Sequence, residues 1–346
     1  MRFKLVLIAG MFIASAGMPG CRDSGSGPGD CTGLSLPPRE WLGGLSSEAV
    51  QSVLRLDGTV WSWGPGYSGT LGNGDTSSSD TPVQALNLHD VLGIDQSWGA
   101  AVAVDKQGDI WFWGNVRAYA GSPDQDTNTL APVKLAHLPG TTSISMYLNV
   151  VHLLRSDCTV WRLVLDFFAP KVSEGPTKVA CNVVFINKLL AVTGGGRVFE
   201  LNRDRFLKGE LLDVVAVSGD ASRHVLALRS DSTVWALDSN VVGELGDGTF
   251  VSSEVPVQVK GLTDVVQVSA QFSYSLALKK DGSVWFWGFE GREGDQLVGQ
   301  NTPIRIEGLD NVALICAYHD CLVMKRDGTY WRFDVRTKLP TQVPLW

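Results

Sequence analysis

The sequence has little that would support catalysis or metal binding. Its five histidines are scattered, with no His-Glu-x-x-His motif and no pair at a ligand spacing. It contains neither a Gly-x-Ser-x-Gly nucleophile elbow nor a phosphate-binding P-loop. The cysteines lack Cys-x-x-Cys and zinc-site spacings. We therefore expect no metal, no cofactor and no enzymatic activity.

Two short motif matches are better explained by loops. Residues 64–69 spell Gly-x-Gly-x-x-Gly, but this stretch opens a loop between β-like segments and not a helix, so it does not indicate a dinucleotide site. Residues 124–128 begin like a calcium-binding loop. Thr129 and Leu135, however, stand where such a loop needs a glycine and a bidentate glutamate. A solvated polar loop is the interpretation we favour there.

Basic residues are also scarce. The chain has 29 Lys and Arg against 36 Asp and Glu, a net charge of −7 and a pI near 5.3. Proteins that bind nucleic acids usually carry a basic face and have a high pI. The composition therefore predicts no nucleic-acid partner.

What the sequence does contain is a repeat. An apolar segment, a turn of the Asp-Gly type and a segment centred on an aromatic residue recur seven times, most clearly at 275–288. The central aromatic residues are Trp61, Trp111, Trp161, Phe199, Trp235, Trp285 and Trp331. A period of this length indicates stacked supersecondary units, none of which can bury its apolar faces alone.

Each unit reads as four β-strands. Asp-Gly pairs such as Asp57-Gly58 supply the positive φ angles of a tight hairpin, whereas Asp157-Cys158 and Asp231-Ser232 predict more strained turns or turns of another type. A proline near the start of the last segment of several units suits an edge strand. We predict an all-β fold over residues 42–346, a seven-bladed β-propeller of four-stranded antiparallel blades, with the unit around Phe199 the least regular.

The repeat resembles that of the regulator of chromosome condensation family. The resemblance rests on residues 266–288 and on the Gly-x-Leu-Gly loops at 69–72 and 243–246, each followed by a Pro-Val segment. The histidine that this family places before the second strand is present only as His224. The resemblance implies seven blades. Its members serve as exchange factors, inhibitors and scaffolds, so the fold alone does not give the function.

The amino terminus predicts export. Arg2 and Lys4 precede an apolar segment, 5–16, which is too short to span a bilayer and ends in small residues before Cys21. We predict a signal peptide at 1–20, a bacterial lipoprotein-like lipidation site at Cys21 and a flexible tether at 21–41. The expected location is the bacterial cell envelope through this lipid anchor, or otherwise the secreted fraction.

Cysteine positions support an oxidising location. Cys316 and Cys321 flank a hairpin of the seventh repeat symmetrically, so we predict a disulfide between them. Cys158 and Cys181 fall at the same end of the propeller and form a second predicted pair. The alternative is that some of these residues are ordinary buried thiols.

Large side chains occur at the predicted tips of the first hairpins, where Gly, Asn or Ser is usual. They are Trp98, Tyr147, Leu148, Phe185, Phe272 and Tyr318. Strand direction places these tips at the same end as the long loops between third and fourth strands. Two interpretations remain open: the side chains form a partner-binding face, or they fold inward and fill the propeller tunnel.

These features predict a non-catalytic protein-binding or scaffold module at the bacterial cell envelope. It would bind an envelope or secreted protein through one loop-rich face, as a monomer that contacts the membrane only through its anchor. Glycan binding through the tip aromatics is the alternative. A polysaccharide-active enzyme with paired carboxylates is a third possibility.

Overall fold

The computed structural model describes most of the chain after the predicted tether. The described residues are 42–44, 50–55, 57–97, 99–115, 128–166, 170–219, 223–271, 273–293, 296–317, 321–334, 337 and 339–343. Within these ranges every regular element is a strand, and no helix is present that could cross a membrane. The predicted signal peptide, tether and lipidation site at Cys21 lie outside these ranges. The chain divides into two compact units, one ending at Lys188 and the other starting at Leu189.

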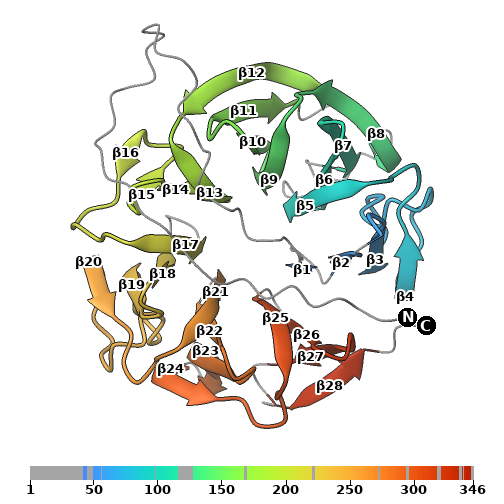
Figure 1. Ribbon diagram of the computed structural model, residues 1–346. Coiled ribbons are helices and arrows are strands. Elements are labelled where there is room, and N and C mark those ends of the chain that lie inside the picture. Colours follow the sequence, from blue (N-terminus) through green and yellow to red (C-terminus); the bar gives the residue numbers. More distant parts are fainter. Residues whose placement is uncertain are drawn as a thin grey trace, which may run out of the picture. The chain divides into compact units, whose positions relative to one another are not determined.

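The strands form seven four-stranded antiparallel sheets in which neighbours in sequence are neighbours in the sheet (Figure 1). Blade 1 contains β1 (Leu42–Gly44), β2 (Gln51–Leu54), β3 (Val60–Gly64) and β4 (Ser79–Gln84). Blade 2 contains β5 (Val91–Ser97), β6 (Ala100–Asp105), β7 (Asp109–Gly114) and β8 (Thr129–His137). Blade 3 contains β9 (Thr141–Tyr147), β10 (Val150–Arg155), β11 (Val160–Leu165) and β12 (Val172–Ala180).

The remaining four blades repeat this pattern. Blade 4 contains β13 (Val183–Asn187), β14 (Leu190–Thr193), β15 (Val198–Glu200) and β16 (Arg205–Phe206). Blade 5 contains β17 (Val214–Gly219), β18 (His224–Arg229), β19 (Val234–Asp238) and β20 (Ser253–Gln258). Blade 6 contains β21 (Val265–Gln271), β22 (Tyr274–Lys279), β23 (Val284–Glu293) and β24 (Gln296–Arg305). Blade 7 contains β25 (Val312–Cys316), β26 (Cys321–Lys325), β27 (Tyr330–Phe333) and β28 (Pro340–Val343).

The predicted fold class is confirmed: the protein is an all-β, seven-bladed β-propeller. Blade 4 is the least regular, as expected, because its last two strands are only three and two residues long. The turns of blades 3 and 5 keep the geometry of the Asp-Gly turns. Cys158 and Ser232 adopt left-handed φ angles of 60° and 64°, where the other blades place glycine.

An aspartate organises the turn between the second and third strands in five blades. Its Oδ1 accepts hydrogen bonds from the backbone N–H and the hydroxyl of the residue two positions later, as Asp57 does with Thr59. That hydroxyl in turn accepts the indole N–H of the third-strand tryptophan at 2.9–3.2 Å. The five tryptophans are Trp61, Trp161, Trp235, Trp285 and Trp331. The Asp, Thr or Ser and Trp of the repeat are therefore one hydrogen-bonded unit.

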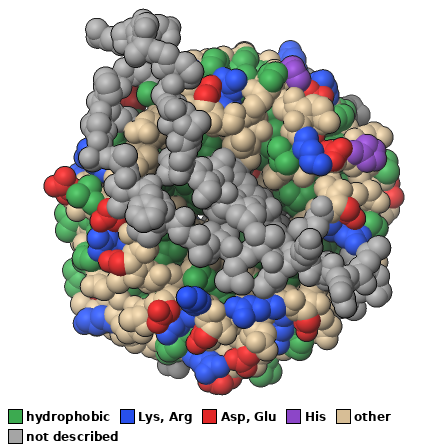
Figure 2. Space-filling model, viewed as in Figure 1, with side chains coloured by type: hydrophobic (Ala, Val, Ile, Leu, Met, Phe, Trp, Pro, Cys, Tyr) green, Lys and Arg blue, Asp and Glu red, His purple; other side chains and the backbone are tan. Residues whose placement is uncertain are grey.

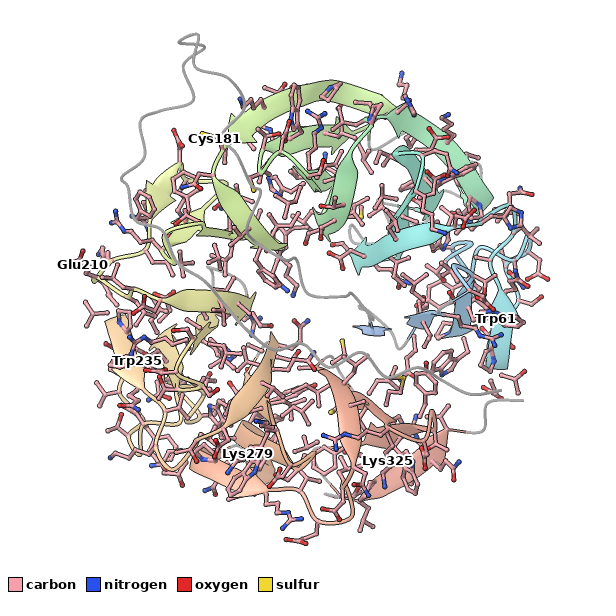
Figure 3. The ribbon with its side chains drawn as sticks, viewed as in Figure 1. Trp61, Cys181, Glu210, Trp235, Lys279 and Lys325 are labelled. Carbon is pink, nitrogen blue, oxygen red and sulfur yellow. The ribbon has the colours of Figure 1, made fainter. Side chains whose placement is uncertain are left out.

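A cation covers the ring of this tryptophan in four of the blades. The distance from the cation to the ring centroid is 4.2 Å for Lys325 over Trp331 and between 5.7 and 5.9 Å in the other three. Figure 3 labels Trp61, Lys279 and Lys325 at these positions. Cation–π contact of this kind helps to fix the half-exposed indole.

The apolar core lies between successive blades. On β23, side chains alternate between the two faces of the sheet. Phe286 belongs to a cluster with blade 7 and lies 6.1 Å from the ring of Phe333. Trp285 and Trp287 belong to a cluster with blade 5. The third strand of a blade is thus buried on both faces, which explains its density of aromatic residues.

A register shift marks the start of the first hairpin in blades 2, 3, 5, 6 and 7. In blade 7 it falls between Val312 and Leu314, so that Cys316 lies opposite Leu322 and not opposite Cys321. Adjacent residues of a strand point to opposite faces of the sheet. The side chains of Cys316 and Cys321 therefore leave on different faces. The structure holds them as two thiols, and the disulfide predicted between them is wrong.

The second predicted pair, Cys158 and Cys181, is not held as thiols. Cys158 and Cys181 are both disulfide-bonded in the structure. The Val183 N–H donates to the Cys158 carbonyl at 3.0 Å, which brings the start of β13 beside the β10–β11 turn.

We expect peptide mapping of the mature protein under non-reducing conditions to find Cys158 linked to Cys181, and Cys316 and Cys321 as alkylatable thiols after unfolding. A short bridge of this kind constrains the unfolded chain modestly. A peptide containing Cys316 linked to Cys321 would contradict the register described above.

Candidate protein-interaction surface

Exposed apolar side chains concentrate around blade 5. Six of the twelve exposed large hydrophobic residues in the described chain fall between positions 212 and 255. They are Leu212, Val215, Val241, Phe250, Val251 and Val255. Contiguous exposed apolar surface on a folded protein usually marks an interaction site.

The most exposed of them lie on the loop between β19 and β20, residues 239–252, which we call the blade-5 loop. Val241, Phe250 and Val251 expose 67%, 53% and 71% of their surfaces. Apolar surface left in contact with water is unfavourable. Folding does not bury these side chains, but association with a partner would. The blade-5 loop is therefore the strongest candidate for a contact surface.

The backbone of the blade-5 loop is held from within by Asn240, whose side chain is completely buried. Its Nδ2 donates to the carbonyl oxygens of Thr249 and Val251 at 3.1 and 3.2 Å. Its Oδ1 accepts the N–H of Leu245 at 2.9 Å. One amide side chain thus ties together both ends and the middle of the loop, which replaces the backbone pairing that a loop lacks.

Glu244 anchors the same loop to blade 6. Its backbone carbonyl accepts the indole N–H of the fully buried Trp287 at 2.7 Å and the hydroxyl of Ser275 at 3.0 Å. The Ser275 hydroxyl oxygen also lies 2.9 Å from Nε2 of His224. Since the hydroxyl gives its proton to Glu244, Nε2 of His224 donates to Ser275. The Glu244 carboxylate accepts the N–H of Val242 at 2.8 Å.

Close backbone approach completes the anchor. The Gly248 N–H donates to the Asn301 carbonyl at 2.8 Å. A Cβ at Gly246 would lie 2.8 Å from Nε1 of Trp287, so only glycine lets the loop reach the buried indole. The apolar tips of the blade-5 loop are consequently carried on a preformed backbone.

Blade 1 contains a loop of the same design. The carbonyl of Thr70 accepts the indole N–H of the buried Trp113 of blade 2 at 3.0 Å, and the Gly74 N–H donates to the Leu130 carbonyl at 3.0 Å. Tyr67, which is half exposed, takes the place of Val241. The rest of this loop is polar, so its apolar surface is smaller than that of the blade-5 loop.

The predicted tip residues are only partly placed. Trp98, Phe272 and Tyr318 lie outside the described residues. Tyr147 ends β9 and Leu148 begins the turn, with a φ of 54° and its N–H donated to Oγ of Ser97 at 2.8 Å. Both side chains are half-buried. Their exposure is therefore smaller than that of Val241, Phe250 and Val251.

Phe185 is not at a hairpin tip. It lies inside β13, and the turn follows at Lys188, which has a φ of 50°. The prediction that placed Phe185 at a tip is wrong, because the second strand of blade 4, β14, has only four residues where β10 has six, so the turn lies nearer to Phe199 than the alignment of the aromatic residues implied.

Charged side chains gather at the base of the blade-5 loop. Asp238 ends β19, and Glu200 is buried and accepts hydrogen bonds from Arg203 and Arg205 at 3.0 and 3.2 Å. Burial, followed by repulsion from Glu200, raises the pKa of Asp238 to about 6. Lys208 pairs with Glu254 on the adjoining strand. In Figure 2, basic and acidic side chains are interspersed over blades 5 to 7. No group of three or more His, Cys, Asp or Glu suited to a metal ion occurs within the described ranges.

The architecture and the surface define the class: a repeat-built β-propeller with loops that present apolar side chains. Residues 57–100 match the regulator of chromosome condensation (RCC1) repeat. This match covers one repeat and not the whole chain, so it shows what the chain is similar to: proteins built from RCC1 repeats.

Two curated proteins resemble it along most of its length. It is 26% identical to the E3 ubiquitin-protein ligase HERC2 of Mus musculus over 327 residues, which cover 87% of this chain but only 6% of HERC2. It is 26% identical to the ultraviolet-B receptor UVR8 of Arabidopsis thaliana over 348 residues, covering 86% of this chain and 78% of UVR8. Among solved structures, Prp20p from Saccharomyces cerevisiae superposes with a TM-score of 0.68 at 15% identity, covering 84% of this chain and 87% of Prp20p.

The glycine that contacts Trp287 gives a test of the anchor. We expect Gly246→Ala to destabilise the protein more than Gly261→Ala, measured by urea unfolding. Both glycines have left-handed φ angles, 65° and 71°, but a Cβ at Gly261 would meet nothing within 4 Å. Gly261→Ala isolates the cost of the φ angle, about 1 kcal/mol. Gly246→Ala adds a clash with a buried ring, a further ~1–3 kcal/mol. Equal losses would show that the indole does not fix the loop.

Asp238 makes stability depend on pH. A carboxyl whose pKa is raised in the folded state stabilises the fold while it is protonated. This stabilisation is complete at a pH below its pKa in the unfolded chain, and it is lost as the pH rises through its pKa in the folded protein. We therefore expect the free energy of unfolding to fall between about pH 4 and pH 7, and Asp238→Asn to reduce that fall by on the order of 1 kcal/mol, since partial exposure screens the effect. Identical pH profiles for the two proteins would show that Asp238 keeps an ordinary pKa.

Proposed function

We propose that this chain is a non-catalytic protein-binding propeller whose main contact surface is the blade-5 loop. The observation that carries the proposal is the combination of three strongly exposed apolar side chains, Val241, Phe250 and Val251, with a backbone fixed by the buried Asn240. A preformed loop loses little conformational entropy on binding, so more of the contact energy appears as affinity. An aromatic residue near the centre of an apolar patch is a typical anchor.

The relatives support this class of function without naming a partner. The study of the Prp20p structure also treats the binding of that protein to Gsp1p and histones. The names of HERC2 and UVR8 describe a ubiquitin ligase and a light receptor. These roles differ, as expected when one fold hosts many functions. Since the chain spans 6% of HERC2, the ligase activity of that protein gives no expectation for this one.

The proposal includes export to the bacterial cell envelope, with an envelope or secreted protein as the partner. Its support is the sequence of residues 1–21, a charged start, an apolar core and a lipobox-like Cys21. The non-reducing peptide map described above also identifies the first residue of the protein and any modification on it. An acylated Cys21 supports the anchored form, and an unprocessed Met1 contradicts export.

Substitution of the exposed loop residues tests the binding surface. We expect the double variant Phe250→Ser/Val251→Ser to bind a partner captured with the wild-type protein about 30-fold more weakly, equivalent to about 2 kcal/mol. The melting temperature should stay close to wild type, because both side chains are exposed. Affinity is measured by surface plasmon resonance against the purified partner.

The matched control is Leu339→Ser, which removes an equally exposed apolar side chain, 65%, before β28 and away from the loop. Its affinity should equal that of the wild type. If the loop variant binds as tightly as this control, the blade-5 loop is not the contact surface.

A further inference from the structure

The segment that enters blade 5 is one residue longer than its counterparts. In blades 2, 6 and 7, two residues with left-handed φ angles stand three positions apart and enclose a leucine that is buried. These pairs are Asn87 and Asp90, Gly261 and Asp264, and Gly308 and Asn311, around Leu88, Leu262 and Leu309. Before blade 5 the pair is Gly209 and Asp213, four positions apart. The additional residue is Glu210.

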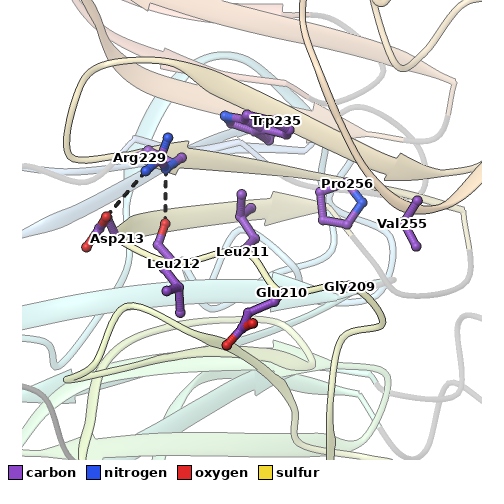
Figure 4. Close-up of a pocket in the computed structure, with 9 residues that line it drawn as sticks. All are labelled: Gly209, Glu210, Leu211, Leu212, Asp213, Arg229, Trp235, Val255 and Pro256. Atoms are coloured by element: carbon purple, nitrogen blue, oxygen red, sulfur yellow. Dashed lines mark hydrogen bonds and ion pairs between the residues drawn. The ribbon is translucent and has the colours of Figure 1, made fainter.

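The insertion opens a pocket. Leu211 takes the place of the buried leucine but is only half-buried, and a pocket of about 440 Å³ separates its segment from the blade. Figure 4 shows Leu211 directed toward Trp235, with Pro256 beside them. Gly209 lines the far end, where a Cβ would lie 2.7 Å from Cδ of Pro256. Figure 3 labels Glu210, which lies on the inserted segment, and Trp235, which lies on β19 of blade 5.

One wall of the pocket is an aromatic surface. Trp235 is half-buried, and its indole N–H is already donated to Oγ1 of Thr233 at 3.2 Å. A ligand therefore meets the face of the indole and not its polar edge. With Leu211 and Pro256, this face makes an apolar slot that fits a flat, weakly polar ring.

The other wall is polar, with the guanidinium of Arg229 paired to two carboxylates. Nε of Arg229 donates to the Leu212 carbonyl at 3.0 Å, Nη1 to Asp231 at 2.9 Å and Nη2 to Asp213 at 3.3 Å. A guanidinium has five N–H groups, so each Nη of Arg229 has a second donor. The side chains of Arg229 and Asp213 remain 25% and 38% exposed. The pocket thus offers donors and an acceptor next to an aromatic face.

We propose that this pocket binds a neutral sugar ring. The apolar face of a pyranose packs against the indole of Trp235, and adjacent hydroxyls bond to the second N–H groups of Arg229 and to the Asp213 carboxylate. Carboxylates outnumber the single guanidinium, which disfavours an anion, and a ring with neighbouring hydroxyls can use both the Arg229 donors and the Asp213 acceptor. A purely apolar side chain of a protein partner would cover the Arg229 and Asp213 pair without giving it new hydrogen bonds, which is costly.

Isothermal titration calorimetry with four neutral tetrasaccharides tests this site: cellotetraose, maltotetraose, laminaritetraose and chitotetraose. We expect the mature full chain to bind at least one of them with a Kd below about 1 mM, as suits a small open pocket. Trp235→Ala should weaken that binding at least about 10-fold, as expected for loss of an aromatic anchor. Trp161→Ala, which removes the equivalent tryptophan of blade 3, should leave it unchanged. Absence of binding by all four, or equal affinities of the two variants, overturns the proposal.

A second pair of variants keeps the test decisive if Trp235→Ala fails to fold. Deletion of Glu210 restores the three-position spacing of blades 6 and 7 and should abolish sugar binding without lowering the melting temperature. Glu210→Ala keeps the length of the segment and should retain binding. Sugar binding that survives the deletion contradicts the proposal. The loop variant Phe250→Ser/Val251→Ser should bind sugar normally, so failure of the protein-binding proposal and failure of this one are distinguishable.

Discussion

The hydrogen bond from the indole of Trp287 to the backbone carbonyl of Glu244 links the core of one blade to the loop of the preceding one. The donor is fully buried, so breaking this bond would leave an unsatisfied polar group in an apolar cluster. Because the loop must reach the indole, it needs glycine at position 246 and an internal brace at Asn240. The exposed apolar side chains are thus carried on a loop whose backbone is fixed from within.

The repeat explains which parts of the fold were predictable from the sequence. The turn aspartate, the hydroxyl residue and the tryptophan are neighbours in sequence and also form one hydrogen-bonded unit, as in Asp281, Ser283 and Trp285. A local pattern of this kind identifies the third strand of five blades without knowledge of the rest of the fold, and the aromatic residues Trp111 and Phe199 mark it in blades 2 and 4. Seven such strands were enough to predict the blade count.

Features that depend on register or on single insertions were not predictable in this way. The register shift before Cys316 moves its side chain to the other face of the sheet. The sequence from Val312 to Leu314 has no feature that predicts this shift. The role of Asn240 depends on contacts with residues up to eleven positions away. The contact surface was predicted at the strand tips and not at Phe250, because the sequence does not show which apolar residues of the blade-5 loop are buried, as Val242 and Leu245 are, and which are exposed.

We propose that the blade-5 loop is the surface through which this propeller contacts a protein partner. Site-specific photo-crosslinking tests that claim most directly, with benzoylphenylalanine placed at Phe250 in one protein and at Leu339 or Tyr147 in two others. The account predicts a discrete protein adduct from position 250 and none from position 339. An adduct from position 147 with none from position 250 would contradict it and assign the partner to the hairpin tips.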